Sequence, residues 1–154
     1  MIPYEDQVRV FASKGFALWD LVQSCERKGS LDQDIKNELA NPIREFCDSH
    51  PSVRRIVIAN GTTGCAMFSR HFRDWWLSGE LKPAKNEQST KAFKRFAKRT
   101  GDFKKGKIEV VCALAVSPAA AIFKYADKRD FWETYCYHPG LNDYEELMDI
   151  NGAN

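Results

Sequence analysis

The sequence predicts an α/β protein, specifically a three-layer α/β/α sandwich with a mainly parallel central sheet. Three β-rich runs, at 16–22, 54–59 and 107–116, lack strict alternation of apolar and polar residues and are separated by helical patterns. Runs of this kind are typical of parallel strands that are covered on both faces. The chain has 154 residues, 44% of them hydrophobic, which is enough for one domain with its own core. We therefore expect a single domain over 1–154, with a basic insertion at 82–107.

Two helical patterns flank the first β-rich run. One covers 4–14 and ends at Gly15, because glycine readily adopts the backbone conformation that follows a helix. The other begins at Asn41 and Pro42, where asparagine is a favoured cap and proline a favoured first helical residue. We expect this second helix to end near His50.

Two further helical patterns follow the later β-rich runs. The segment NGTTG (60–64) opens a helix whose apolar side chains recur on one face, and the last helix covers about 124–135. Three aromatic residues of the last helix are expected to point toward the core. The apolar face of the helix that NGTTG opens is made by Cys65, Phe68, Phe72 and Trp76. The aromatic residues of the last helix are Phe131, Trp132 and Tyr135.

The net charge of +2 hides an uneven distribution of charge. Ten Lys or Arg residues and two acidic residues lie between Lys82 and Lys107, a local charge of +8, so the rest of the chain carries −6. Such a cluster of positive charge can attract a polyanionic partner even though the net charge of the chain is small. The alternative is a solvated insertion with a lysine-rich face.

The basic segment also contains a helical pattern, STKAFKRFAKRTG (89–101). It predicts a short helix that is capped by Ser89 or Thr90, ends at Gly101 and docks through two phenylalanines. Its cations would then face solvent, and a phosphate backbone is the partner that they favour. The docking residues are Phe93 and Phe96, and the candidate DNA contacts are Lys94, Arg95, Lys98 and Arg99.

Composition disfavours several other classes of protein. No apolar run approaches the ~20 residues of a membrane span, and the first residues lack the apolar core of a signal peptide. The five cysteines are widely spread and without CxxC spacing, so we expect ordinary thiols rather than disulfides or a zinc site. We expect no metal, no cofactor, no membrane partner and a monomer. The expected location is intracellular, nuclear in a eukaryote or cytoplasmic in a bacterium.

In a parallel sheet, ligands bind beyond the carboxyl ends of the strands. Three loops are expected there: DLVQSCERKGS (20–30), NGTTG (60–64) and AVSPAAA (115–121). Asp20 lies near the end of its predicted strand, where a polar group can face a pocket. The NGTTG segment offers the free N–H groups of a helix start to an anion, although plain helix capping requires the same residues.

Four segments taken together resemble the uracil-DNA glycosylase superfamily, and most closely its hypoxanthine-DNA (deoxyinosine) glycosylase branch. They are GFALWDLVQSCERKGSLDQDI, HPSVRRIVIANGTTGCAMF, VCALAVSPAAA and DKRDFWETYCYHPGL. The resemblance covers about 15–141. It implies a base excision repair enzyme that binds double-stranded or single-stranded DNA and flips out a damaged base. The enzyme would then hydrolyse the N-glycosidic bond without a metal or cofactor.

The resemblance also implies roles for individual residues. Asp20, with Trp19 beside it, falls where members of the superfamily contact the flipped base, and a carboxylate would accept a hydrogen bond from the ring N–H of hypoxanthine or uracil. Alternatively, Asp20 caps the following turn. Ser117 and Pro118 match the short loop that fills the gap left by the flipped nucleotide. The remaining residues implied to contact DNA are Ser24, Arg27, Gly29, Ser30, Gly61, Thr62 and Thr63.

Two departures from the superfamily affect the expected chemistry. The last loop has alanines where many members carry a histidine, and the motif that positions the attacking water is not found before residue 15. The catalytic residues are therefore unassigned. We expect main strands only near 16–22, 54–59 and 108–115, with a gap, an exposed edge or an unusually open face where a fourth should lie, and little excision by this chain alone. The alternatives are a catalytically inactive DNA-binding remnant and an unrelated α/β module for a small phosphorylated ligand.

Overall fold

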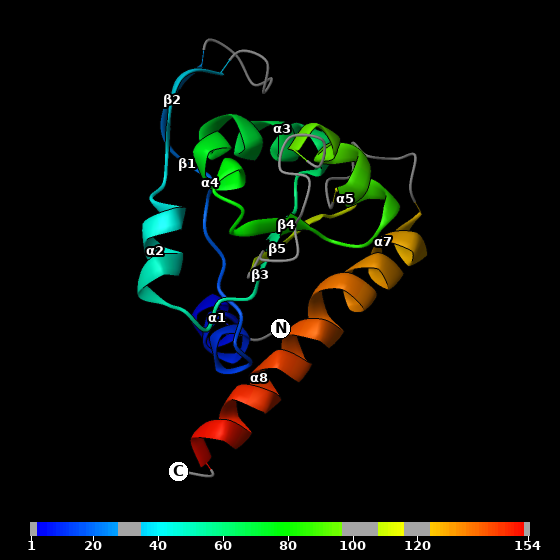
Figure 1. The fold of residues 1–154 in the computed structure, drawn as a ribbon. Coiled ribbons are helices and arrows are strands. Elements are labelled where there is room, and N and C mark those ends of the chain that lie inside the picture. Colours follow the sequence, from blue (N-terminus) through cyan, green and yellow to red (C-terminus); the bar gives the residue numbers. More distant parts are fainter. Residues whose placement is uncertain (1–2, 28–34, 97–107, 116–123, 153–154) are drawn as a thin grey trace. The chain divides into compact units, whose positions relative to one another are not determined.

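The computed structural model describes residues 3–27, 35–96, 108–115 and 124–152 (Figure 1). The chain divides into two compact units. The larger unit contains Met1–Ala17 and Ser52–Asn154, and the smaller one contains Leu18–Pro51.

The larger unit is built around a parallel sheet with strand order β3-β5-β4. β3 (Arg55–Ile58) and β4 (Leu81–Pro83) both pair in parallel with β5 (Ile108–Cys112), which lies between them. The predicted α/β class is thus confirmed, as are two of the three predicted strands. Within the described residues β3 and β4 are the two edges of this sheet.

The short strand β4 was not predicted. It lies at the start of the segment expected to be a basic insertion, and it ends in Pro83. Proline lacks the N–H needed for a second ladder, which confines it to edge strands. β4 meets this condition because its only partner in the described sheet is β5.

Helices cover one face of the sheet. α3 (Gly61–His71) follows β3 directly, and a methyl group placed on Gly64 would lie 2.9 Å from Cγ2 of Ile58. Glycine therefore lets α3 approach the strand closely. The next helix, α4 (Arg73–Leu77), completes the predicted apolar stripe, since Cys65, Phe68 and Trp76 are all buried.

The phenylalanines of the basic segment are anchored in this same core. α5 (Glu87–Ala92) leads to Phe93 and Phe96, whose ring centroids lie 4.7 Å and 5.1 Å from that of Trp76. All three residues are almost fully buried, and burying a large apolar side chain contributes roughly 1.5–3 kcal/mol. The docking predicted for this segment is therefore confirmed.

The predicted start of that helix was wrong. The cap is Asn86, whose side-chain oxygen accepts a hydrogen bond from the Ser89 N–H at 2.8 Å. Ser89 lies one turn inside the helix, and its hydroxyl oxygen accepts a bond from the Cys112 N–H at the end of β5. The hydroxyl thus ties α5 to the sheet. The predicted end of the helix, Gly101, lies outside the described residues.

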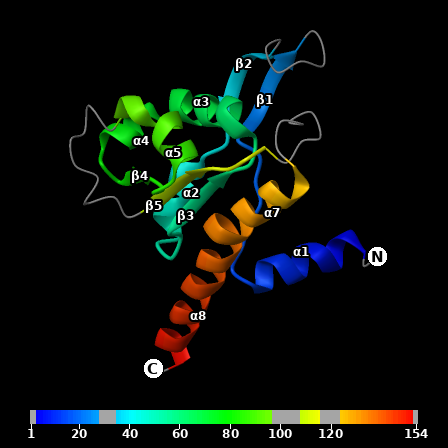
Figure 2. The ribbon, with the colours of Figure 1, turned by 90° about the vertical axis from the view of Figure 1, so that its right-hand side faces the viewer.

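A continuous helical rod covers the opposite face of the sheet (Figure 2). It consists of α7 (Tyr125–Trp132), a π-helical turn η3 (Glu133–Tyr137) and α8 (His138–Gly152). The sequence predicted a helix of about 124–135, shorter than the one observed. The π turn explains how the helix passes Pro139. The His138 N–H donates to the carbonyl of Glu133, five residues back, so the turn is widened just before the proline ring.

The N-terminal residues also belong to the larger unit. α1 (Tyr4–Ser13) confirms the predicted first helix, and Phe11 stacks on Phe16 with a centroid distance of 5.1 Å. Phe16 in turn meets the edge of the Tyr137 ring and comes within van der Waals range of Gly140. The aromatic residue that was expected to begin a strand therefore packs on the helical rod.

The smaller unit contains an antiparallel pair of strands and a helix. β1 (Val22–Arg27) pairs with β2 (Ile35–Ala40), and α2 (Ile43–Ser49) follows. α2 confirms the predicted second helix, although no side chain caps it, and the amide of Asn41 instead donates to the backbone carbonyl of Asp20 at 2.6 Å.

The predicted buried strand at 16–22 was wrong. Residues 16–20 have no regular structure, and strand pairing starts only at Val22, with the neighbouring segment of the chain rather than with the parallel sheet. Leu18 is 86% exposed, so the apolar run does not form a buried element. A short apolar run without alternation does not by itself specify a partner strand. Antiparallel pairing with the next segment of the chain needs only a short loop, whereas parallel pairing needs a long crossover connection.

No helix among the described residues is long and apolar enough to span a membrane. The cysteines whose side chains the structure describes are free and buried, as expected of core thiols: Cys47, Cys65, Cys112 and Cys136.

Candidate nucleic-acid interface

The carboxyl ends of β3 and β5 bring two of the predicted loops together. Gly61 begins α3 immediately after β3, and a methyl group placed on it would lie 3.4 Å from Cβ of Ala115, which follows β5. Gly61 has φ of +59°, a conformation that favours glycine. The start of NGTTG and the start of AVSPAAA therefore adjoin at one edge of the parallel sheet.

This edge presents polar groups to solvent. Thr62 and Thr63 are exposed in the first turn of α3, and no side chain caps the free N–H groups of that turn. Such N–H groups and the helix dipole favour an anion. Ser117 and Pro118 of the neighbouring loop lie outside the described residues.

The docked basic segment presents cations on the surface of the larger unit. Phe93 and Phe96 hold the segment in the core, whereas Lys94 and Arg95 are exposed. The guanidinium carbon of Arg95 lies 5.1 Å from the centroid of the Phe96 ring, in a cation–π contact. Lys98 and Arg99 lie outside the described residues.

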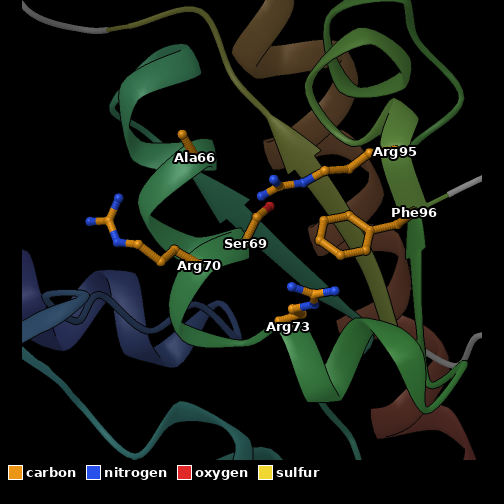
Figure 3. Close-up of a pocket in the computed structure, with 6 residues that line it drawn as sticks. All are labelled: Ala66, Ser69, Arg70, Arg73, Arg95 and Phe96. Carbon is orange, nitrogen blue, oxygen red and sulfur yellow. The ribbon is translucent and has the colours of Figure 1, made fainter.

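A hollow of about 410 Å³ opens beside Arg95 (Figure 3). We call it the arginine hollow. Two more arginines reach it, one from the last turn of α3 and one from the first residue of α4. Its floor contains a serine hydroxyl that is buried. The lining residues are Ala66, Ser69, Arg70, Arg73, Arg95 and Phe96.

Sequence reasoning missed this hollow. Ala66, Ser69, Arg70 and Arg73 are spaced i, i+3, i+4, i+7, the spacing that puts residues on one face of a helix. That spacing was a usable signal. The contribution of Arg95 was not visible, because only the packing of Phe93 and Phe96 brings it to this face.

The residues predicted to contact the base and border its pocket belong to the smaller unit. Trp19 and Asp20 are exposed, and the Trp19 ring meets the edge of the Phe46 ring at a centroid distance of 5.6 Å. Ser24 and Arg27 are in β1, so their backbone belongs to the antiparallel pair. Gly29 and Ser30 lie outside the described residues. The sequence had placed Asp20 at the end of a strand of the parallel sheet. In the structure Asp20 does not follow any described strand of that sheet.

Three of the buried thiols, Cys47, Cys65 and Cys136, are protonated at neutral pH. Burial raises the pKa of Cys136 to about 11, and burial together with the neighbouring Asp48 raises that of Cys47 to about 11. Contact with the Cys112 thiol and burial raise the pKa of Cys65 further. Among the described side chains, no group of three or more His, Cys, Asp or Glu residues could hold a metal ion.

The fold and this surface define an α/β protein with a parallel sheet and a concentration of arginines on one face. No family model, curated protein or solved structure matches the chain.

Proposed function

We propose that this protein binds DNA and acts as a DNA glycosylase, excising hypoxanthine or uracil by hydrolysis of the N-glycosidic bond. The proposal combines the sequence resemblance to the uracil-DNA glycosylase superfamily with the arrangement of the strand ends. It assigns the chain a role in base excision repair.

The contact between Gly61 and Ala115 carries the proposal. Parallel pairing of β3 and β5 brings together the starts of two motifs that lie far apart in the sequence. A glycosylase needs such a juxtaposition, because one loop holds the backbone while the other fills the gap left by the flipped nucleotide. An arbitrary α/β protein could carry NGTTG and VSPAAA at different edges of its sheet.

The exposed cations supply the affinity in this proposal. Lys94 and Arg95 are exposed between two buried phenylalanines, so their cationic groups can meet phosphates at the surface. Contacts of this kind give binding that does not depend on sequence. Base selectivity then falls to Asp20, whose exposed carboxylate is free to accept a hydrogen bond from a ring N–H.

The alternative proposal is a DNA-binding protein without excision activity. Two observations favour it. Tyr4–Ser13 form a helix in the region where the superfamily has its water-positioning strand and loop, and Asp20 lies outside the parallel sheet. Both proposals use the same cationic surface, so binding alone does not separate them.

A cleavage assay separates the two proposals. The chain is incubated with duplexes that carry inosine, uracil, xanthine or a mismatch, and abasic sites are then revealed by alkaline scission. The glycosylase proposal expects scission at inosine or uracil and none in the undamaged duplex. Binding without scission supports the alternative, and neither binding nor scission contradicts both.

Asp20→Asn and Asp48→Asn are matched variants for this assay. Both replace an exposed carboxylate of the smaller unit by an amide. Only Asp20→Asn should reduce scission at the damaged base. Equal effects of the two substitutions would contradict the base-reading role of Asp20.

A further inference from the structure

The arginine hollow contains a buried hydroxyl that lacks a partner. Ser69 is 2% exposed, and within the described part of the chain its Oγ makes no hydrogen bond. An unsatisfied buried polar group costs about 1–3 kcal/mol. In a folded protein such a group requires an explanation, and an absent ligand is one.

The surroundings of this hydroxyl are cationic. Figure 3 shows the side chains of Arg95, Arg73 and Ser69 around the hollow that they line. Neither Arg73 nor Arg95 forms an ion pair with a carboxylate in the described residues. By contrast, Arg54 and Arg55 in the same unit are both paired.

We propose that the arginine hollow binds a phosphate group. Arg73 and Arg95 donate to its oxygens from two different elements, and the Ser69 hydroxyl donates from the floor. Guanidinium groups suit this role because their donors can bind two phosphate oxygens at once. A tetrahedral oxyanion has enough acceptors for three separate donors, whereas a carboxylate has only two oxygens.

The Ser69 oxygen is covered, and Arg95 lines the same hollow. In this proposal an anion that draws the Arg95 guanidinium outward opens a path to the hydroxyl and satisfies both groups. The hollow is formed by α3, α4 and the residues after α5, so it is a second anion site in addition to the start of α3.

The test titrates the full chain with inorganic phosphate at constant ionic strength and follows the backbone amide signals of Ser69 and Phe96 by NMR. Saturable shifts are expected in the unmodified chain. The double variant Arg73→Gln/Arg95→Gln should bind phosphate at least about tenfold more weakly, because it lacks two charge-assisted hydrogen bonds. Arg9→Gln is the matched control. It removes the same kind of charge from an exposed residue of α1 that does not line the hollow, and should bind phosphate normally.

Ser69→Ala distinguishes binding from a structural role. Removing an unpartnered hydroxyl should leave the melting temperature unchanged or raise it, while phosphate binding weakens several-fold. A lower melting temperature with unchanged phosphate binding would overturn the proposal. So would equal phosphate affinity in the double variant and the Arg9→Gln control, acetate binding as tight as phosphate binding, or the absence of saturable shifts in the unmodified chain.

The phosphate could belong to a DNA backbone or to a free nucleotide, and two further titrations separate these sources. A short duplex without terminal phosphates competes with inorganic phosphate if the backbone is the source. If the source is a free phosphomonoester, a nucleoside 5′-monophosphate should bind through Arg73 and Arg95. The duplex affinity of the double variant should then be unchanged. Phosphate binding by a chain that fails to bind any duplex would support the hollow and contradict the proposed DNA-binding function.

Discussion

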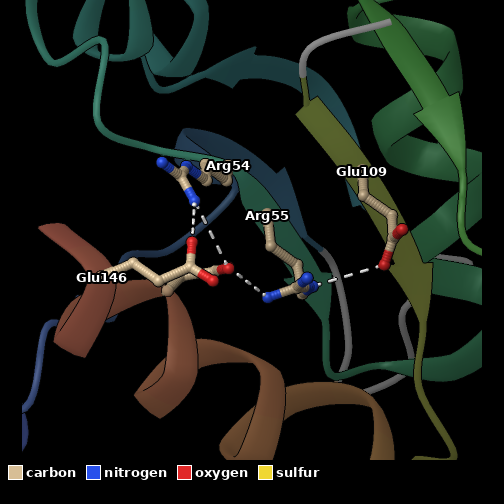
Figure 4. Close-up of polar contacts among 5 residues, drawn as sticks. Arg54, Arg55, Glu109 and Glu146 are labelled. Carbon is tan, nitrogen blue, oxygen red and sulfur yellow. Dashed lines mark hydrogen bonds and ion pairs between the residues drawn. The ribbon is translucent and has the colours of Figure 1, made fainter.

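Arg55 of β3 and Asp143 of α8 form an ion pair with a nitrogen-to-oxygen distance of 2.9 Å across 88 residues of sequence. The same guanidinium reaches Glu109 of β5 at 3.3 Å, so one arginine joins two strands and a helix (Figure 4). Arg54 extends the network to Glu146 at 3.1 Å. These contacts attach the helical rod to the face of the sheet opposite α3.

Replacing Arg55 by Met should destabilise the larger unit. The Arg55 side chain is only 18% exposed, and its removal takes the cation from Glu109 and leaves Asp143 with only its longer contact to Arg54, at 3.7 Å. We expect a loss of roughly 2–3 kcal/mol in the free energy of unfolding, measured by urea denaturation. Arg129→Met is the control, because Arg129 pairs with Asp130 at the surface and should change stability by less than about 0.5 kcal/mol. Equal losses would show that the network contributes no more than a surface pair.

Replacing Lys94 by Gln should weaken DNA binding equally for every sequence. The variant neutralises one phosphate fewer. The slope of log affinity against log salt concentration should therefore become less steep by about 0.9. Fluorescence anisotropy at several salt concentrations measures both effects. Arg9→Gln is the control, since Arg9 is an exposed cation of α1, outside the basic segment. An unchanged salt slope in Lys94→Gln would move the DNA-binding surface elsewhere.

Asp20→Ala should leave folding and binding of undamaged duplex nearly intact while removing preference for a damaged base. The Asn41 amide bonds the Asp20 backbone carbonyl rather than its carboxylate, so the substitution keeps that hydrogen bond. The change in stability should stay within about 0.5 kcal/mol, as for other exposed positions. If the melting temperature drops sharply and the preference survives, Asp20 is a structural cap.

Stability should fall as the pH rises above 9, in part because of Cys136. Its pKa is raised from 9.0 to about 11 by burial, so the unfolded chain loses the thiol proton first and the native state binds more protons over this interval. The stabilisation is complete below pH 9 and is lost as the pH rises toward 11. At pH 10 the loss should be about 1 kcal/mol.

Comparing the unmodified chain with Cys136→Ala isolates this effect. Urea denaturation at pH 7 and pH 10 should show a smaller loss of stability between the two pH values in the variant. Identical losses would mean that the thiol titrates normally in the folded protein. Slow alkylation of Cys136 in the native state, with fast alkylation in urea, gives an independent check.

Much of the larger unit could be predicted from sequence because its elements depend on local patterns. The stripe of Cys65, Phe68 and Trp76 recurs at helical spacing, and its burial follows from that spacing alone. The runs that became β3 and β5 are rich in β-branched residues between clear helix signals. The docking of Phe93 and Phe96 followed from the same reasoning.

The errors occur where the choice of partner decides the structure. Nothing within 16–22 specifies which strand it should join, and the antiparallel partner of Val22 lies in the neighbouring segment that follows. The arginine hollow was also invisible, because it depends on residues from three elements. The last helix was predicted to end near residue 135, and its continuation past Pro139 depends on the widened turn before the proline, which the sequence pattern did not reveal.

The π-helical turn has a rotational consequence for everything that follows it. One extra residue in a turn advances an α-helix by about 100° around its axis. The direction in which Asp143 and Glu146 leave α8 is therefore set by Glu133–Tyr137, a full turn or more earlier in the chain. Without this offset the two carboxylates would point about a quarter of a circle away from Arg54 and Arg55. The side of α8 from which Asp143 and Glu146 project is thus fixed by the π-helical turn before it.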